Sequence, residues 1–85
     1  MAETPFDSIE SAHEYVRLLA CEVDCVTDLI QKEIADAVAE QAERRVDNLR
    51  LVDYKLKQLA QHLSTSRRIL NDLQMLRRLL LAGRV

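Results

Sequence analysis

Glycine, proline and aromatic residues are almost absent from this 85-residue sequence. The single glycine, Gly83, and the single proline, Pro5, lie near the two ends, so no helix-breaking residue stands between positions 6 and 82. Tryptophan is missing, and the aromatic residues are Phe6, Tyr15 and Tyr54. The good helix formers Leu, Ala, Glu, Arg and Gln dominate the rest, which is typical of long helices or coiled coils.

Features of secreted and membrane-spanning proteins are also missing. Two cysteines, Cys21 and Cys25, four residues apart on one expected helix face, do not make a disulfide framework. Residues 1–12 lack the basic start and apolar core of a signal peptide, and no apolar run approaches the ~18 residues of a membrane span. We therefore expect a cytoplasmic protein with reduced thiols and no transmembrane segment.

Motifs that carry chemistry are scarce as well. One glycine is too few for a glycine-rich phosphate loop. The segment 13–17 matches only the start of a zinc-protease helix, because Arg17 stands where that motif needs its second histidine ligand. No Ser-His-Asp or Cys-His arrangement is indicated. We therefore expect a chain that is not an enzyme, with no catalytic residue and no cofactor.

The spacing of apolar residues is the main signal for the fold. Two series step by three and four residues, as heptad repeats do, and Ser66 is their only polar member. The first series is Ile9, Ala12, Val16, Leu19, Val23, Val26 and Ile30. The second series is Leu49, Val52, Leu56, Leu59, Leu63, Ser66, Leu70 and Leu73. These positions predict two amphipathic helices that pack along one seam.

The two series are out of phase, which predicts a reversal of the chain between them. The polar stretch 43–48 is the weakest helical segment, so we expect one all-α domain over residues 1–85, with helices at about 6–42 and 47–82 joined by a turn at about 43–47. A break at residues 62–66, giving a three-helix bundle, is the alternative, because hydroxyl side chains there can cap a new helix. The uninterrupted second series favours the hairpin.

The predicted helices carry more apolar surface than one seam can bury. Apolar residues off the seam predict a second interface, because exposed contiguous apolar area usually marks a binding surface. The predicted interface residues are Leu18, Cys21, Cys25, Leu29, Leu51, Tyr54, Ile69, Met75 and Leu79. We expect two hairpins to form a homodimeric four-helix bundle, and the chain to act as a protein-interaction, scaffold or adaptor module for itself or another protein.

Charge is unevenly distributed and provides an alternative function. Residues 1–28 carry a net charge of −6, residues 29–63 a net charge of zero and residues 64–85 a net charge of +4. The basic end contains Arg67, Arg68, Arg77 and Arg78, a possible contact for anions or for the phosphates of a nucleic acid. In an antiparallel hairpin the acidic start would lie beside these arginines, so charge pairing between the helices is the simpler interpretation.

A metal-binding bundle is a further alternative. Cys21 and Cys25 supply two thiols, whereas a structural zinc site usually has four Cys or His ligands. Glu10 and His13 have the Glu-x-x-His spacing of di-iron carboxylate bundles, which need two such elements. A dimer would double either set, but Glu10 and His13 flank the predicted seam instead of lying in it. We therefore assign no metal ligand.

Overall fold

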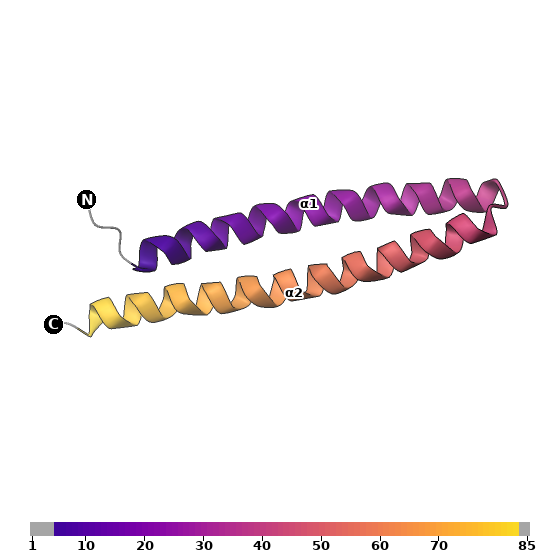
Figure 1. Cartoon of the computed structure of the whole chain (residues 1–85). Helices are drawn as coiled ribbons and strands as arrows, with labels where there is room; N and C mark the ends of the chain where they lie inside the picture. The colour runs from indigo at the N-terminus through magenta and orange to yellow at the C-terminus, as the bar shows by residue number, and fades with distance from the viewer. Residues whose placement is uncertain (1–4, 84–85) are drawn as a thin grey trace.

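The computed structural model describes the backbone of residues 5–83 and the side chains of residues 7–83. It consists of two antiparallel helices, α1 (Pro5–Ala39) and α2 (Glu43–Ala82), which lie side by side along their length (Figure 1). The hairpin measures 67 × 23 × 13 Å, so it is a rod one helix thick in its shortest dimension. The predicted all-α helical hairpin is therefore confirmed.

The chain reverses over residues 40–42, slightly before the predicted turn. Gln41 adopts the left-handed conformation, with φ of 59°. The Gln41 N–H donates to the Val38 carbonyl and the Ala42 N–H donates to the Ala37 carbonyl, each at 3.0 Å. These two bonds form a Schellman motif, which ends α1. The sequence did not reveal it because the left-handed position is usually occupied by glycine or asparagine, and here it is glutamine.

The alternative break at residues 62–66 is absent, since α2 continues through this segment. The hydroxyls of Thr65 and Ser66 donate to the backbone carbonyls of Gln61 and His62, one turn earlier, at 3.1 and 2.8 Å. Such bonds place both side chains within a helix, where they cap nothing. A three-helix bundle is therefore wrong for the part of the chain that the structure describes.

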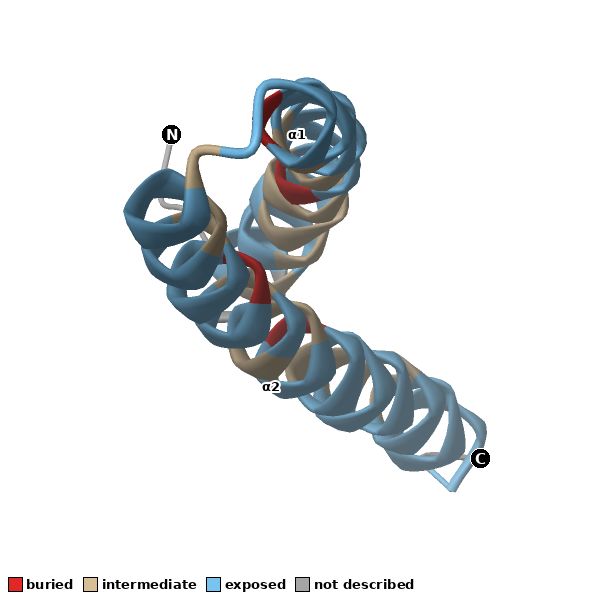
Figure 2. Cartoon of the chain, turned by 90° about the vertical axis from the view of Figure 1, so that its right-hand side faces the viewer, coloured by how far each residue is buried: buried red, intermediate tan, exposed pale blue. Residues whose placement is uncertain are grey.

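Heptad letters, with Ile9 and Leu49 as a positions, describe how the helices meet. Most buried and half-buried residues of α1 occupy positions a and e: Ile9, His13, Val16, Ala20, Val23, Thr27, Ile30, Ile34 and Ala37; Arg17 (b) and Leu19 (d) beside them are also half-buried. Those of α2 occupy the same two positions over most of its length: Val46, Leu49, Asp53, Leu56, Ala60, Leu63, Leu70, Gln74 and Arg77; Gln58 (c) and Ser66 (d) are also half-buried. Figure 2 shows the buried segments where the helices face each other. The helices therefore meet through a and e.

This contact corrects half of the predicted seam. The predicted a residues, such as Val23 and Leu63, are indeed covered. The predicted d residues Val26, Val52, Leu59 and Leu73 are not in the seam, and they remain 39%, 43%, 42% and 37% exposed. The e positions pack instead because Ala20 and Ala60 allow close approach of the helices, and because Asp53 finds a partner there.

Polar contacts join the helices at several points along the described residues. Gln31 donates to the Asp53 carboxylate at 2.7 Å, in the half of the hairpin nearer the turn. Arg77 pairs with Glu10 at the open end of the hairpin, and Arg45 pairs with Glu33 close to the turn. The Arg77–Glu10 pair brings the basic end of the chain beside its acidic start, as the charge distribution predicts.

Candidate interaction surface

One chain covers few of its large apolar side chains. Among the described residues, the buried hydrophobic side chains are Val23, Ala37 and Leu63, whereas sixteen large hydrophobic side chains are exposed. The accessible surface is 7019 Å², against about 5,200 Å² expected for a compact monomer of 9.8 kDa. An excess of this size is comparable to the area buried in a protein–protein interface.

Nine of the sixteen exposed large apolar residues lie on one side of the hairpin, at heptad positions d and g. In an antiparallel pair that meets through a and e, the d positions of both helices flank the contact on one side and the b positions flank it on the other. Most d positions are apolar, and the g positions next to them are mixed. We call the large apolar residues at these positions, with the half-buried Leu19, the apolar face: Tyr15, Leu19, Val26, Leu29, Val52, Leu59, Ile69, Leu73, Leu76 and Leu80.

The opposite side is polar except for Val38, an exposed b residue near the turn. We call its polar b residues the polar face: Glu10, Arg17, Asp24, Gln31, Arg50, Lys57, Ser64, Asn71 and Arg78. The contacts between the helices agree with this division. Glu10 and Gln31 reach across on the polar face to Arg77 and Asp53. The Glu33–Arg45 pair lies at d positions near the turn, so it closes that end of the apolar face.

A shallow groove on α2 illustrates the character of the apolar face. It is lined by Leu51, Val52, Lys55, Leu56 and Leu59, and its walls are almost wholly apolar. Val52 and Leu59 are d residues, one heptad apart. The groove is thus part of the apolar face, and the spaces between such d residues are where side chains of another helix pack in a bundle.

The residues predicted for the second interface are all exposed, but they do not lie together. Leu29 and Ile69 belong to the apolar face as g residues. Four c residues lie along its outer edges: Leu18, Cys25, Leu51 and Leu79. Three f residues lie on the sides of the helices away from both faces: Cys21, Tyr54 and Met75. The d residues Val26, Val52, Leu59 and Leu73 extend the face, although the sequence had placed them in the seam.

Asp53, an e residue of the seam next to the polar face, is the buried charged side chain among the described residues, at 9% exposed. Its carboxylate lies 2.8 Å from the Lys57 ammonium, one turn along α2, and accepts the hydrogen bond from Gln31. The Lys57 contact, followed by the Gln31 bond, lowers the pKa of Asp53 below its ordinary value, against the opposing effect of desolvation. Asp53 is therefore ionised and satisfied at neutral pH.

The predicted arginine contact divides into two parts. Arg67 and Arg68 line a hollow with His13, Ser64 and Asn71, and no carboxylate lines that hollow. Arg77 is engaged by Glu10 and lines a separate hollow together with Arg78. Arg67 also lines a neighbouring hollow that Asp24 shares. The structure therefore brings Arg67 and Arg68 together in one hollow, and both this pair and the pair Arg77 and Arg78 have an acidic residue nearby.

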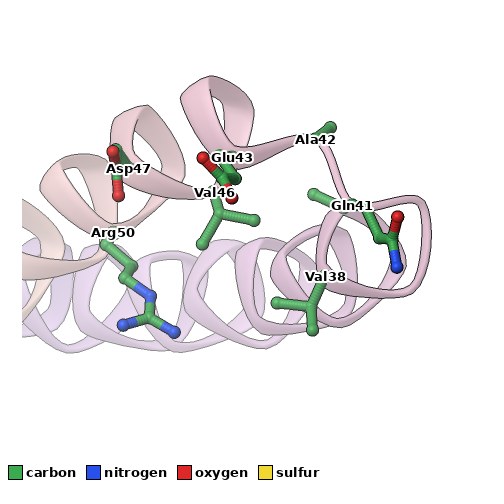
Figure 3. Close-up of a pocket in the computed structure, with 8 residues that line it drawn as sticks. Val38, Gln41, Ala42, Glu43, Val46, Asp47 and Arg50 are labelled. Atoms are coloured by element: carbon green, nitrogen blue, oxygen red, sulfur yellow. The ribbon is translucent and has the colours of Figure 1, made fainter.

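The largest hollow lies at the turn, where Val38, Gln41, Ala42, Val46 and neighbouring residues line it (Figure 3). Val46 and Arg50 point across from α2 toward α1. The charged groups in its wall, from Glu43, Asp47 and Arg50, all come from the first turns of α2. The mixture of small apolar and oppositely charged groups fits the packing of the turn better than the binding of a cofactor.

No three His, Cys, Asp or Glu side chains gather closely enough to hold a metal ion within the described residues. Cys21 and Cys25 are unpaired and exposed. Neither of the two described helices is long and apolar enough to span a bilayer.

Comparison with known proteins gives no relative for this chain. No family model matches it, and neither a curated protein nor a solved structure is significantly similar to it. The apolar face is thus the feature from which a function has to be argued.

Proposed function

We propose that this chain is a non-enzymatic helical interaction module that self-associates through its apolar face and serves as a small scaffold or adaptor. The observation that carries the proposal is the one-sided distribution of exposed Leu, Val and Ile side chains over both helices. Contiguous apolar surface of this extent on a small chain usually marks a binding site for protein. A chain of this length also gains much of its stability from association, since its own core is small.

The energetics favour a helical partner. Burying one Leu or Val side chain contributes about 1.5–3 kcal/mol relative to leaving it in water. The d residues Val26, Val52, Leu59 and Leu73 are only between one third and one half exposed, so a partner gains only part of that amount at each of these positions. The face repeats every heptad along both helices, and a partner with matching heptads would collect these partial gains many times.

Sedimentation measurements test the proposal with matched variants. At tens of micromolar the unchanged protein is expected to sediment with at least twice the mass of one chain. The double variant Leu59→Gln/Leu73→Gln removes two d residues of α2 and is expected to sediment as a monomer of unchanged helical content. The control Tyr54→Gln/Met75→Gln removes two exposed apolar residues outside the apolar face and should leave the mass unchanged. An unchanged protein that is monomeric and binds no apolar dye would contradict the proposal.

A cytoplasmic location is part of the proposal. Cys21 and Cys25 are both exposed and unpaired, a state that a reducing compartment maintains. Partners other than the chain itself would be proteins that present a complementary apolar helix to the same face.

Anion or nucleic-acid binding is the second candidate function. It is favoured by the hollow in which Arg67 and Arg68 lie beside His13, Ser64 and Asn71. Guanidinium, amide and hydroxyl groups are the donors with which proteins contact phosphate. The net charge of −2 and the short extent of the hollow make this candidate secondary to the apolar face.

A further inference from the structure

The helices are rotated about their axes in a way that the single hairpin does not explain. The strongest apolar stripe in the sequence runs along a and d, but the helices meet through a and e. Positions that are adjacent on the helical wheel of a heptad lie about 50° apart around the helix. The centre of the a/d stripe is therefore turned by roughly 50° away from the neighbouring helix. In a square four-helix bundle, the direction to the bundle axis and the direction to a neighbouring helix differ by roughly 45°.

Each helix therefore points its a and d residues where the core of a four-helix bundle would be. Most e residues that form the hairpin contact are small or polar, including Ala20, Thr27 and Ala60, as suits the boundary between neighbouring helices of a bundle; Ile34 and Val46, near the turn, are the large apolar exceptions. The larger d residues, such as Leu59 and Leu73, remain partly exposed on the apolar face. The hairpin therefore has the geometry of one layer of a two-layer bundle.

We propose that a second copy of this chain supplies that layer, with α1 of each copy lying over α2 of its partner around a two-fold axis parallel to the long axis. This inference rests on the proposed self-association and specifies its geometry. The other closed arrangement has its two-fold axis across the helices, and it lays α1 over the partner's α1 and α2 over the partner's α2. Charge at the g positions distinguishes the two.

The register of the hairpin fixes which g residues would meet. Gln31 bonds Asp53, which places these two residues at about the same height along the rod. A two-fold axis parallel to the rod preserves height, so in the proposed arrangement Glu22 lies opposite the partner's His62 and Tyr15 lies opposite the partner's Ile69. Leu29 then packs on the alkyl chain of the partner's Lys55. Each of these contacts is chemically complementary.

The other arrangement opposes like groups. With the two layers in full overlap, Glu22 would face the partner's Glu22 and His62 would face the partner's His62 at the centre of the bundle. Like charges placed directly opposite each other are destabilising, whereas a carboxylate opposite an imidazole N–H accepts a hydrogen bond. The g residues thus favour α1 over the partner's α2.

Disulfide trapping tests this geometry in a background in which both native cysteines are serine (Cys21→Ser/Cys25→Ser). Glu22→Cys and His62→Cys are then introduced in separate chains, so that no disulfide can form within one chain. After the two proteins are mixed, allowed to exchange subunits and oxidised mildly, the proposal expects a 22–62 disulfide between chains. Each protein alone should form little covalent dimer.

Two results would overturn the geometry. One is efficient 22–22 or 62–62 disulfide formation by either protein alone. The other is that the background protein (Cys21→Ser/Cys25→Ser) has the mass of a dimer, but the mixture of Glu22→Cys and His62→Cys made in that background forms no disulfide. A background protein that sediments as a monomer would instead contradict self-association itself, so the two failures are distinguishable.

The variant Glu22→Gln provides a second readout. In the proposed geometry it weakens the dimer about two- to ten-fold, because two Glu22–His62 contacts per dimer lose their charge. In the other geometry it strengthens the dimer, because it removes a repulsion between the two Glu22 side chains.

Discussion

The side-chain amide of Gln31 donates a 2.7 Å hydrogen bond to the Asp53 carboxylate, and this bond joins the two helices at the edge of their seam. The second carboxylate oxygen is engaged by Lys57 at 2.8 Å. A charged group at 9% exposure needs such partners, because an unpaired buried charge is costly. The polar contact therefore favours one register of α1 against α2, since a shift of either helix would leave Asp53 without Gln31.

Asp53 should make the stability of the hairpin depend on pH in the acid range. The pKa of Asp53 is lowered from 3.8 in the folded chain, so the unfolded chain binds the proton more readily. Its contribution is complete above the unfolded pKa and is lost as the pH falls through the lower folded value. We expect Asp53→Asn to flatten the dependence of the urea midpoint on pH below about pH 5.

A matched control for this prediction is Glu14→Gln. Arg17 also lowers the pKa of Glu14, through a side-chain hydrogen bond. Both partners of this pair are well exposed, so solvent and salt screen the effect. In high salt Glu14→Gln should leave the pH dependence nearly unchanged. Identical pH curves for Asp53→Asn and the unchanged protein would argue against an ionised, bonded Asp53.

The turn should become more stable when Gln41 is replaced by glycine. Gln41 has a φ of 59°, a conformation that glycine adopts without the steric penalty of a side chain. We expect Gln41→Gly to raise the free energy of unfolding by up to about 1 kcal/mol. The gain is limited because glycine loses more conformational entropy on folding than glutamine does. Gln41→Val should lower it, because a β-branched residue tolerates positive φ poorly. Thermal unfolding followed by circular dichroism measures both, and the opposite order would contradict the Schellman turn.

Two leucines of α2 should respond differently to truncation. Leu63 is 7% exposed in the seam, and Leu63→Ala should destabilise the folded chain by about 2–4 kcal/mol at any protein concentration. Leu59 is 42% exposed on the apolar face, and Leu59→Ala should cost less than about 1 kcal/mol in dilute protein. We expect unfolding measurements over a hundredfold range of protein concentration to show a further loss of stability for Leu59→Ala. This further loss should be seen only at concentrations at which the unchanged protein is associated. Equal losses at all concentrations would contradict a role for Leu59 in assembly.

The arginine hollow can be tested by retention on heparin. If it binds phosphate-like anions, the protein should be retained at low salt, and Arg67→Ala/Arg68→Ala should abolish retention. The control Arg44→Ala/Arg50→Ala removes the same charge from the turn half of the molecule and should elute like the unchanged protein. No retention of the unchanged protein at low salt would remove anion binding as a candidate.

The fold class followed from the sequence because helix-breaking residues are absent between the ends and because apolar residues recur every three and four positions. These two features require only local chemistry. The a residues, such as Val16 and Leu56, were placed correctly for the same reason. The chain reversal was located to within a few residues, but the left-handed Gln41 was not predicted, since neighbouring turns of helix give no preference for it.

The sequence did not predict on which side of the a residues the helices would meet. Positions d and e flank position a symmetrically, and the more apolar d row gave the stronger signal. The structure uses the e row because Ala20 and Ala60 are small and because Gln31 can reach Asp53 there. Such a choice depends on pairs of residues far apart in the chain, which the spacing of one helix does not contain.

Pro5 and Ala82 lie at the same end of the hairpin, and the turn lies at the other (Figure 1). A pair of copies related by an axis along the rod would keep this directionality: four helix termini would crowd one tip and two compact loops the opposite tip. The two ends of such a dimer differ. A protein fused to either terminus would always extend from the same end of the rod, some 67 Å from the end that carries the turns.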